Sequence, residues 1–388
     1  MSVRKTLFRW HRWLGLIAAL PLLLISLSGA ILVFKAPLDR WLLADQVALS
    51  ASQQGQRLPL DQLLQLVHQQ IPGYQVGSWE LFDDGIEADR LYMIRFGSSD
   101  WFKAYLNPYS GEVLRQPVGL NEDFSDWLLQ LHYTLLLDEQ VPGLPWLGLT
   151  LGLLSAAALI VLGISGLLVQ RRWLQNLWQK PWHARPSVGW RKLHRFSGAW
   201  VSPVLLVLGI TGGYFNLMEL IEEVGEDQHE IVSHYLYEPQ LPLQQLYEQA
   251  QQQWPGYRIH YLLMPYESGG QLVFYGKYPH ANAAVEMLAS DYGSSVWFNP
   301  HSAELEGSFA MPTADFGVQL TDSFRALHFG SFGAFASQLI WTLSGLLIAL
   351  LAISGCWNWL RTTRLKHQPQ RPYQPSDQPS DQPGRRGA

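Results

Sequence analysis

The chain has 388 residues, of which 48% are hydrophobic, 13% aromatic and only 15% charged. Soluble domains carry about 25% charged residues, so this composition favours a membrane protein with extramembrane parts. The formal net charge of −5 excludes a global basic surface for nucleic acid. The one cysteine, Cys356, excludes an intramolecular disulfide, an iron–sulfur cluster held by cysteines, and covalent haem attachment.

Four apolar segments are long enough to cross a bilayer, which takes about 20 residues. They are Trp13 to Phe34, Trp146 to Val169, Gly198 to Met218 and Phe335 to Leu360. The first is uncharged over 22 residues. Because the apolar part of a signal peptide has about 7–15 residues, we expect this segment to remain as a span.

The basic residues predict the orientation of the spans. Segments 1–12, 171–197 and 361–388 carry 17 of the 27 basic residues and two of the 32 acidic residues. Short positive segments stay in the cytoplasm, so we expect both termini there. The long connections 35–145 and 219–333 are then extracytoplasmic. The chain from Gln368 onward is proline-rich and polar, which is typical of a disordered tail.

The expected organisation divides the chain into eight segments. These are the N-terminus with the first span (1–34), the first extracytoplasmic domain (35–145), the second span (146–170), a basic cytoplasmic loop (171–197), the third span (198–218), the second extracytoplasmic domain (219–333), the fourth span (334–360) and a disordered cytoplasmic tail (361–388).

Recurring motifs predict an internal duplication. The matches are Trp10–Gly15 with Leu193–Gly198, Leu27-Ser28-Gly29 with Ile210-Thr211-Gly212, Leu131-His132-Tyr133 with Leu327-His328-Phe329, and Ile164-Ser165-Gly166 with Ile353-Ser354-Gly355. Each half is a span, an extracytoplasmic domain and a returning span, in parallel orientation. Helical and alternating patterns within each domain predict one helix against a small antiparallel sheet.

Four histidines occupy matching places at the ends of the apolar segments. His11 and His194 share the cytoplasmic depth, and His132 and His328 share the opposite depth. Facing histidines suit the two axial positions of b-type haem iron, so the pattern predicts two non-covalent haems, each with two His ligands. The alternative is that each His is an ordinary interfacial residue.

Arg12 and Arg195 adjoin the cytoplasmic histidines. They could bind haem propionates as charge-assisted pairs, or they could be topology anchors. Six residues, Asp138–Gly143, separate His132 from the second span. We therefore expect His132 on a short helix of its own. His328, in contrast, is followed almost directly by the fourth span.

Two haems at opposite depths would conduct electrons across the hydrocarbon core. The chain has no dinucleotide-binding or phosphate-loop motif, so the electron donor must be external, either a quinol or a cytoplasmic reductase protein.

The four histidine motifs resemble the PepSY-associated transmembrane family of bacterial inner-membrane proteins, and the resemblance covers residues 1 to about 365. It implies a four-helix, two-haem bundle under two periplasmic PepSY-like α+β domains. A functional relative that it suggests is the ferric-siderophore reductase. The resemblance therefore implies electron transfer to a periplasmic ferric siderophore, whose hard oxygen ligands bind Fe(II) less tightly. The extracytoplasmic domains diverge between the halves, so no substrate-binding residue is carried over.

Two other classes of function stay open. One is a non-enzymatic membrane protein whose PepSY-like domains bind or regulate a peptidase or another periplasmic partner. The other is a subunit of a metal or siderophore transporter, which we disfavour because the four spans show no buried acids and no sign of a broken helix.

Overall fold

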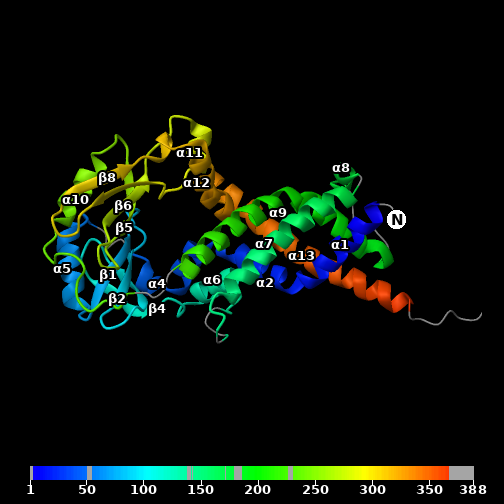
Figure 1. The fold of residues 1–388 in the computed structure, drawn as a ribbon, viewed down its shortest axis with the longest axis horizontal. Coiled ribbons are helices and arrows are strands. Elements are labelled where there is room, and N and C mark those ends of the chain that lie inside the picture. Colours follow the sequence, from blue (N-terminus) through cyan, green and yellow to red (C-terminus); the bar gives the residue numbers. More distant parts are fainter. Residues whose placement is uncertain are drawn as a thin grey trace, which may run out of the picture.

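The computed structural model describes residues 3–49, 55–137, 141, 143–170, 172–178, 186–225 and 230–366. Long apolar helices form a bundle, and a domain built on one sheet lies at one end of it (Figure 1). The expected disordered tail from Gln368 and part of the basic loop 171–197 fall outside the described residues.

The bundle consists of long helices that pack side by side. They are α1 (Val3–Ile17), α2 (Ala19–Leu32), α7 (Leu147–Val169), α9 (Pro186–Gly225) and α13 (Ala334–Lys366). Among the described residues, α7, α9 and α13 are each long and apolar enough to cross a membrane, and α1 with α2 makes a fourth span if the pair counts as one. α7 packs on α9, α9 on α13, and α13 on α2.

The first span is bent. α1 and α2 meet at Ala18 with an angle of 65°, so the expectation of unbroken spans is wrong at this point. Pro21 lacks the N–H that would bond the carbonyl of Ile17, and its ring crowds that carbonyl, which explains a break at this place. The bent pair contains no acidic residue. α9 continues through Pro203 without ending.

Small residues let the spans approach closely, as is common between membrane helices. A Cβ atom added at Gly209 of α9 would lie 2.8 Å from Ile160 of α7, and one added at Gly345 of α13 would lie 2.9 Å from Ala30 of α2. These glycines therefore set the distances between helix axes at two interfaces of the bundle.

Eight antiparallel strands form one sheet in the order β4-β3-β2-β1-β5-β6-β7-β8. Their bounds are β1 Tyr74–Glu80, β2 Asp89–Arg95, β3 Trp101–Leu106, β4 Val113–Gly119, β5 Arg258–Leu263, β6 Leu272–Lys277, β7 Ser294–Phe298 and β8 Leu305–Phe309. The ranges 35–145 and 219–333 supply four strands each and join where β1 pairs with β5. The two expected domains thus share one sheet.

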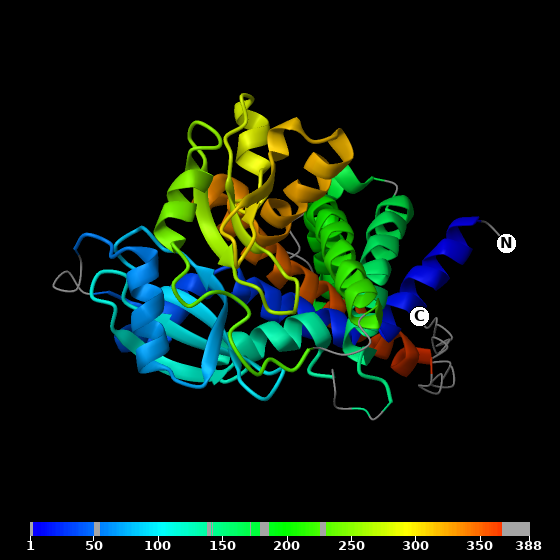
Figure 2. The ribbon, with the colours of Figure 1, turned by 60° about the vertical axis from the view of Figure 1, so that its left-hand side comes forward.

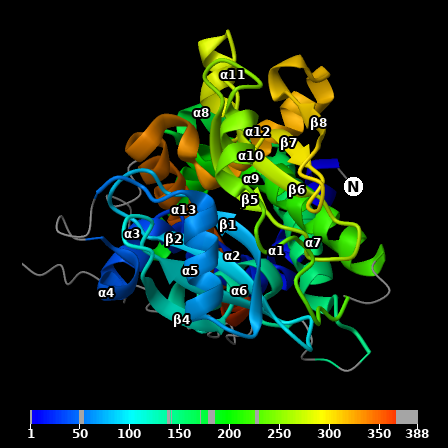
Figure 3. The same ribbon diagram turned by 90° about the vertical axis from the view of Figure 1, so that its left-hand side faces the viewer.

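Two helices cover one face of the sheet, α5 (Leu60–Gln70) and α10 (Leu243–Gln251) (Figure 3). Apolar residues recur in α5 at helical spacing, as Leu60, Leu63, Leu64 and Val67, which gives the helix one buried face. The core under both helices is continuous and contains side chains from both halves of the chain. Burial of this shared apolar surface holds the two halves together.

Two of the shorter helices, α6 and α12, lie between the sheet and the bundle, whereas α8 lies at the other end of the bundle (Figure 1 and Figure 2). The described short helices are α3 Lys35–Leu42, α4 Ala44–Val47, α6 Phe124–Thr134, α8 Trp173–Asn176, α11 Ala283–Leu288, η3 Met311–Thr313, α12 Phe316–Phe329 and η4 Ser331–Gly333. α6 and α12 each follow the last strand of their half. α6 packs against α2 and α7, and α12 packs against α9, so both helices connect the sheet to the bundle.

Candidate functional site

His132 on α6 and His328 on α12 face each other at the end of the bundle next to the sheet. Their ring centroids are 6.2 Å apart. An imidazole nitrogen binds a metal ion at about 2 Å, so two imidazoles on opposite sides of one ion have ring centres about 6 Å apart. We call His132 and His328 the outer pair. Their spacing suits two histidines that hold one iron from opposite sides.

His11 on α1 and His194 on α9 are the second, inner pair, and each contacts a hydroxyl group on a neighbouring span. Thr211, which contacts His328, lies on α9 together with His194. At about 1.5 Å per residue, about 25 Å of helix separates Thr211 from His194. This separation is close to the thickness of a hydrocarbon core, about 30 Å.

Each of the four histidines bonds a hydroxyl group on a neighbouring helix through Nδ1. The distances are 2.8 Å for His11 with Ser165, 2.8 Å for His194 with Ser354, 2.9 Å for His328 with Thr211, and 3.3 Å for His132 with Ser28. Nδ1 of His132 also lies 2.8 Å from the carbonyl oxygen of Ile25. The same kind of contact thus recurs at all four sites.

These contacts favour one tautomer of each ring. A hydroxyl has one proton to donate, and the hydroxyls of Ser28, Ser165, Thr211 and Ser354 each also lie within hydrogen-bond distance of a carbonyl on their own helix. A hydroxyl that donates to this carbonyl accepts from the histidine, which places the proton on Nδ1, and at His132 the carbonyl of Ile25 requires the same assignment. This tautomer leaves the lone pair of Nε2 for a metal ion.

A glycine follows each of these hydroxyl residues and lies next to the ring. A Cβ atom added at Gly29 would lie 2.6 Å from Cε1 of His132, and the corresponding distances are 3.0 Å for Gly212 with His328, 3.4 Å for Gly166 with His11, and 3.6 Å for Gly355 with His194. The glycine is required for the close approach of the ring at Gly29 and is under tight contact at Gly212, whereas a Cβ atom at Gly166 or Gly355 would make an ordinary contact. The recurring Ser-Gly or Thr-Gly was visible in the sequence as a mark of the repeat, but its role as the partner of a histidine was missed.

The residues of the outer pair fit a haem, and the inner pair repeats their contacts with a hydroxyl group. In the part of the chain that the structure describes, three or more His, Cys, Asp or Glu side chains nowhere cluster as a metal site. An iron held by two imidazoles would need its other ligands from elsewhere, and a porphyrin would supply them. The 6.2 Å spacing of the outer rings agrees with two histidines that hold one iron.

The two predicted arginines differ in their surroundings. The Nε atom of Arg12 is buried and has no hydrogen-bond partner among the described residues, and its guanidinium lies 5.3 Å from the ring of Trp13. An unpartnered buried donor next to His11 fits a propionate group. Arg195 is exposed, so the structure places it at the rim of the inner pair.

Both outer histidines lie on short helices of their own. The prediction of a separate helix for His132 is confirmed. His328, which we expected to run almost directly into the fourth span, is also on a separate helix, because Gly330 adopts the left-handed conformation and ends α12 before η4 and α13.

A chain of ion pairs fixes the start of α6 to the sheet. Asp126 pairs with Lys35 at 2.9 Å and with Lys103 of β3. Asp123 pairs with Lys103 at 2.8 Å and with Arg115 of β4 at 2.8 Å. Lys103 and Asp123 are buried. These pairs hold the helix that carries His132 in a defined position against β3 and β4.

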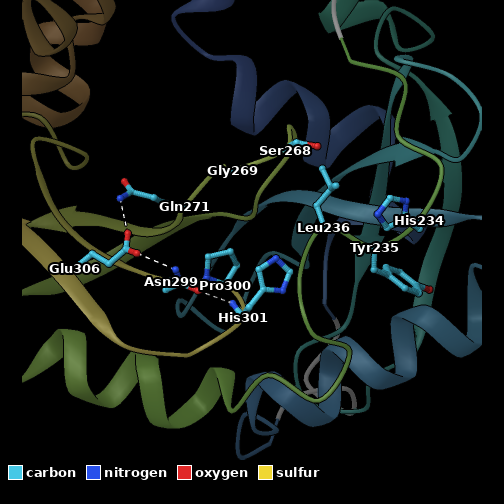
Figure 4. A pocket seen from close by; sticks show the side chains of 11 residues that line it. His234, Tyr235, Leu236, Ser268, Gly269, Gln271, Asn299, Pro300, His301 and Glu306 are labelled. Atoms are coloured by element: carbon cyan, nitrogen blue, oxygen red, sulfur yellow. Dashed lines mark hydrogen bonds between the residues drawn. The ribbon is translucent and has the colours of Figure 1, made fainter.

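A separate pocket of about 340 Å³ lies beside the β5–β6 and β7–β8 turns (Figure 4). It is lined by His234, Tyr235, Leu236, Ser268, Gly269, Gly270, Gln271, Asn299, Pro300, His301 and Glu306. Gln271 and Asn299 both donate hydrogen bonds to Glu306, so this carboxylate is already partnered. None of the predicted site residues lines the pocket.

A family model matches nearly the whole chain. The family model described as the PepSY-associated TM region matches residues 8–362, a range that includes all four paired histidines. The chain belongs to the PepSY-associated transmembrane family. A search of curated proteins gave no match. Membership in the PepSY-associated transmembrane family agrees with apolar helices that cross a membrane and an extramembrane sheet.

Proposed function

We propose that the protein is a di-haem b reductase of the bacterial inner membrane. It passes electrons from a cytoplasmic or quinol donor to a periplasmic ferric siderophore and releases Fe(II) for iron uptake. In this proposal both termini are cytoplasmic, the sheet is periplasmic, and the two halves arose by internal duplication. The same order of span, helix, four strands, short helix and span in each half supports the duplication.

One observation carries the proposal: four histidines form two pairs, and Nδ1 of every one of them contacts a hydroxyl group on a neighbouring helix. Four independent interfacial histidines would have no reason to share this contact. When bound, haem supplies reversible one-electron transfer. The protein's own residues fix the axial ligands, orient their rings and place the two sites about 25 Å apart along α9.

The siderophore step is a one-electron reduction of Fe(III) to Fe(II), and each electron comes from the external donor through the two pairs. Hard oxygen ligands hold Fe(II) less tightly than Fe(III), so reduction favours release of the metal. The outer pair is the exit point because α6 and α12, which carry it, also contact the sheet.

A single-turnover assay tests this function. The detergent-solubilised protein is reduced anaerobically, freed of reductant and mixed with a ferric trihydroxamate or tricatecholate siderophore in the presence of an Fe(II) chelator. We expect both haems to become oxidised and two Fe(II) to appear per chain, and we expect no oxidation by the matching gallium(III) complexes. Haems that stay reduced with both ferric siderophores would contradict the proposal.

A further inference from the structure

The face of the sheet opposite α5 and α10 carries a row of phenol and charged side chains. Side chains of directly paired residues lie on one face of a sheet. The pairs Tyr105–Arg90, Arg90–Glu80, Glu80–Tyr261 and Tyr261–Tyr275 cross the five strands β3, β2, β1, β5 and β6. We call these five residues the Arg90 row.

The neighbouring row of the same strands points the other way. It contains Leu91, Leu262 and Phe274, which are buried in the core under α5 and α10. The Arg90 row therefore faces the side of the sheet on which α6 and α12 lie.

Ring contacts connect the Arg90 row to the outer histidine pair. Tyr261 contacts Tyr292 at 6.0 Å, the guanidinium of Arg325 lies 4.6 Å from Tyr292 and 5.2 Å from Phe329, and Phe329 contacts His328 at 5.8 Å. A ligand held by Arg325 would thus lie next to the ring pair that is the exit point for electrons.

One end of the Arg90 row is covered. Tyr105 packs with Val47 and Leu49 and is only 1% exposed, so this end of the row does not reach a ligand. Tyr261, Tyr275 and Tyr292, at the other end, are half-buried. Burial raises the pKa of Tyr261 and of Tyr292, so both phenols keep their protons at neutral pH.

The charges leave one cation available. Arg90 is paired with Glu80 at 2.6 Å. Arg325 is exposed and makes no ion pair with the carboxylates that the structure describes. The surface therefore combines several phenol donors, flat aromatic rings and one unpaired guanidinium.

We propose that Arg325, Tyr292 and Tyr261 bind the electron acceptor, and that this acceptor is an oxygen-rich, anionic metal chelate. The inference rests on the proposed function and adds the place and charge of its substrate. Guanidinium and phenol groups donate to catecholate or carboxylate oxygens, and the rings of Tyr292 and Tyr261 stack on an aromatic chelating group.

Binding of gallium(III) complexes tests this site without electron transfer, because gallium(III) is not reduced under these conditions. The full-length protein is titrated calorimetrically with the gallium complex of a tricatecholate siderophore, which is anionic, and of a trihydroxamate siderophore, which is not. We expect tighter binding of the anionic complex. R325Q should weaken it at least about tenfold, a change of about 1.4 kcal/mol, and Y292F should weaken it less.

The control is R95Q, which removes an exposed arginine from the other end of β2, where it pairs with Asp100. We expect wild-type binding by R95Q and an unchanged haem spectrum in all variants. The inference is overturned if the wild type does not prefer the anionic complex, if R325Q binds it normally, if R95Q loses binding equally, or if R325Q loses the outer haem. Failure of the single-turnover assay in a protein that binds gallium complexes as expected would instead count against the proposed reductase activity.

Discussion

Four hydroxyl groups favour the tautomer in which Nε2 of each paired histidine is free to bind a metal ion. The contact between Ser354 and Nδ1 of His194, at 2.8 Å, is typical of the set. Partners of this kind orient a metal-binding imidazole and raise its basicity. The hydroxyl residues therefore act on the metal through the histidines, and their loss should be visible in the properties of the haem.

Ser354→Ala tests this role at the inner pair. A less basic His194 stabilises Fe(III) less, so we expect a higher midpoint potential for one haem and haem affinity lower by about tenfold or more. Spectroelectrochemical titration measures the potential. The control is Ser344→Ala on the same helix, whose hydroxyl donates only to the carbonyl of Ile340. An equal shift in both variants, or in neither, would contradict the assignment.

Gly29→Ala tests the close approach at the outer pair. The new Cβ atom would lie 2.6 Å from Cε1 of His132, too close for a real contact, so the ring must move away from the bundle. We expect loss of one haem per chain while the other keeps its spectrum. Gly189→Ala on α9, where a Cβ atom meets nothing within 4 Å, should retain both. Retention of two haems by Gly29→Ala would show that this spacing is not critical.

At the scale of elements, apolar length and periodicity predicted the long helices and the buried face of α5. They could not reveal the break at Ala18, because hydropathy averages over Pro21 and does not register a missing hydrogen bond. The helix that carries His328 was also missed. Gly330 ends α12 by adopting a left-handed backbone, and a glycine next to an apolar run is equally compatible with a continuous helix.

The contact between α5 and the segment before α10 makes the sheet domain sensitive to acid. His68 bonds the hydroxyl of Tyr237 at 3.0 Å and packs against the ring of Tyr235. Burial lowers its pKa from 6.5 to about 4. Between about pH 4 and pH 6.5 the unfolded chain binds a proton at His68 that the folded domain does not. The stability that depends on neutral His68 is therefore fully present above pH 6.5 and is lost as the pH drops towards 4.

His68→Gln keeps a hydrogen-bonding side chain but cannot be protonated. We expect the melting temperature of the wild-type sheet domain to fall more between pH 7 and pH 4.5 than that of His68→Gln, with the two proteins closest in their behaviour above pH 6.5. Thermal unfolding followed by circular dichroism at a series of pH values measures this. Parallel pH profiles for the two proteins would exclude His68 as a cause.

At the scale of the whole molecule, the sequence predicted two domains and the structure has one sheet. Each half contains a helix and four strands, which local patterns can indicate. The pairing of β1 with β5 joins residues nearly half the chain apart, and no local pattern reports which strand edges meet. The pairing of His132 with His328 was predictable because the repeat places both at one depth.

The haem content of the purified, full-length protein tests the central claim most directly. Reduced-minus-oxidised spectra and a pyridine haemochrome assay should show two low-spin haems b per chain in the wild type and in the control His301→Ala, which changes an exposed residue away from both pairs. His328→Ala should lose the outer haem and His194→Ala the inner one. A colourless, fully folded wild type would contradict the account, as would either of these two variants with both haems at full occupancy.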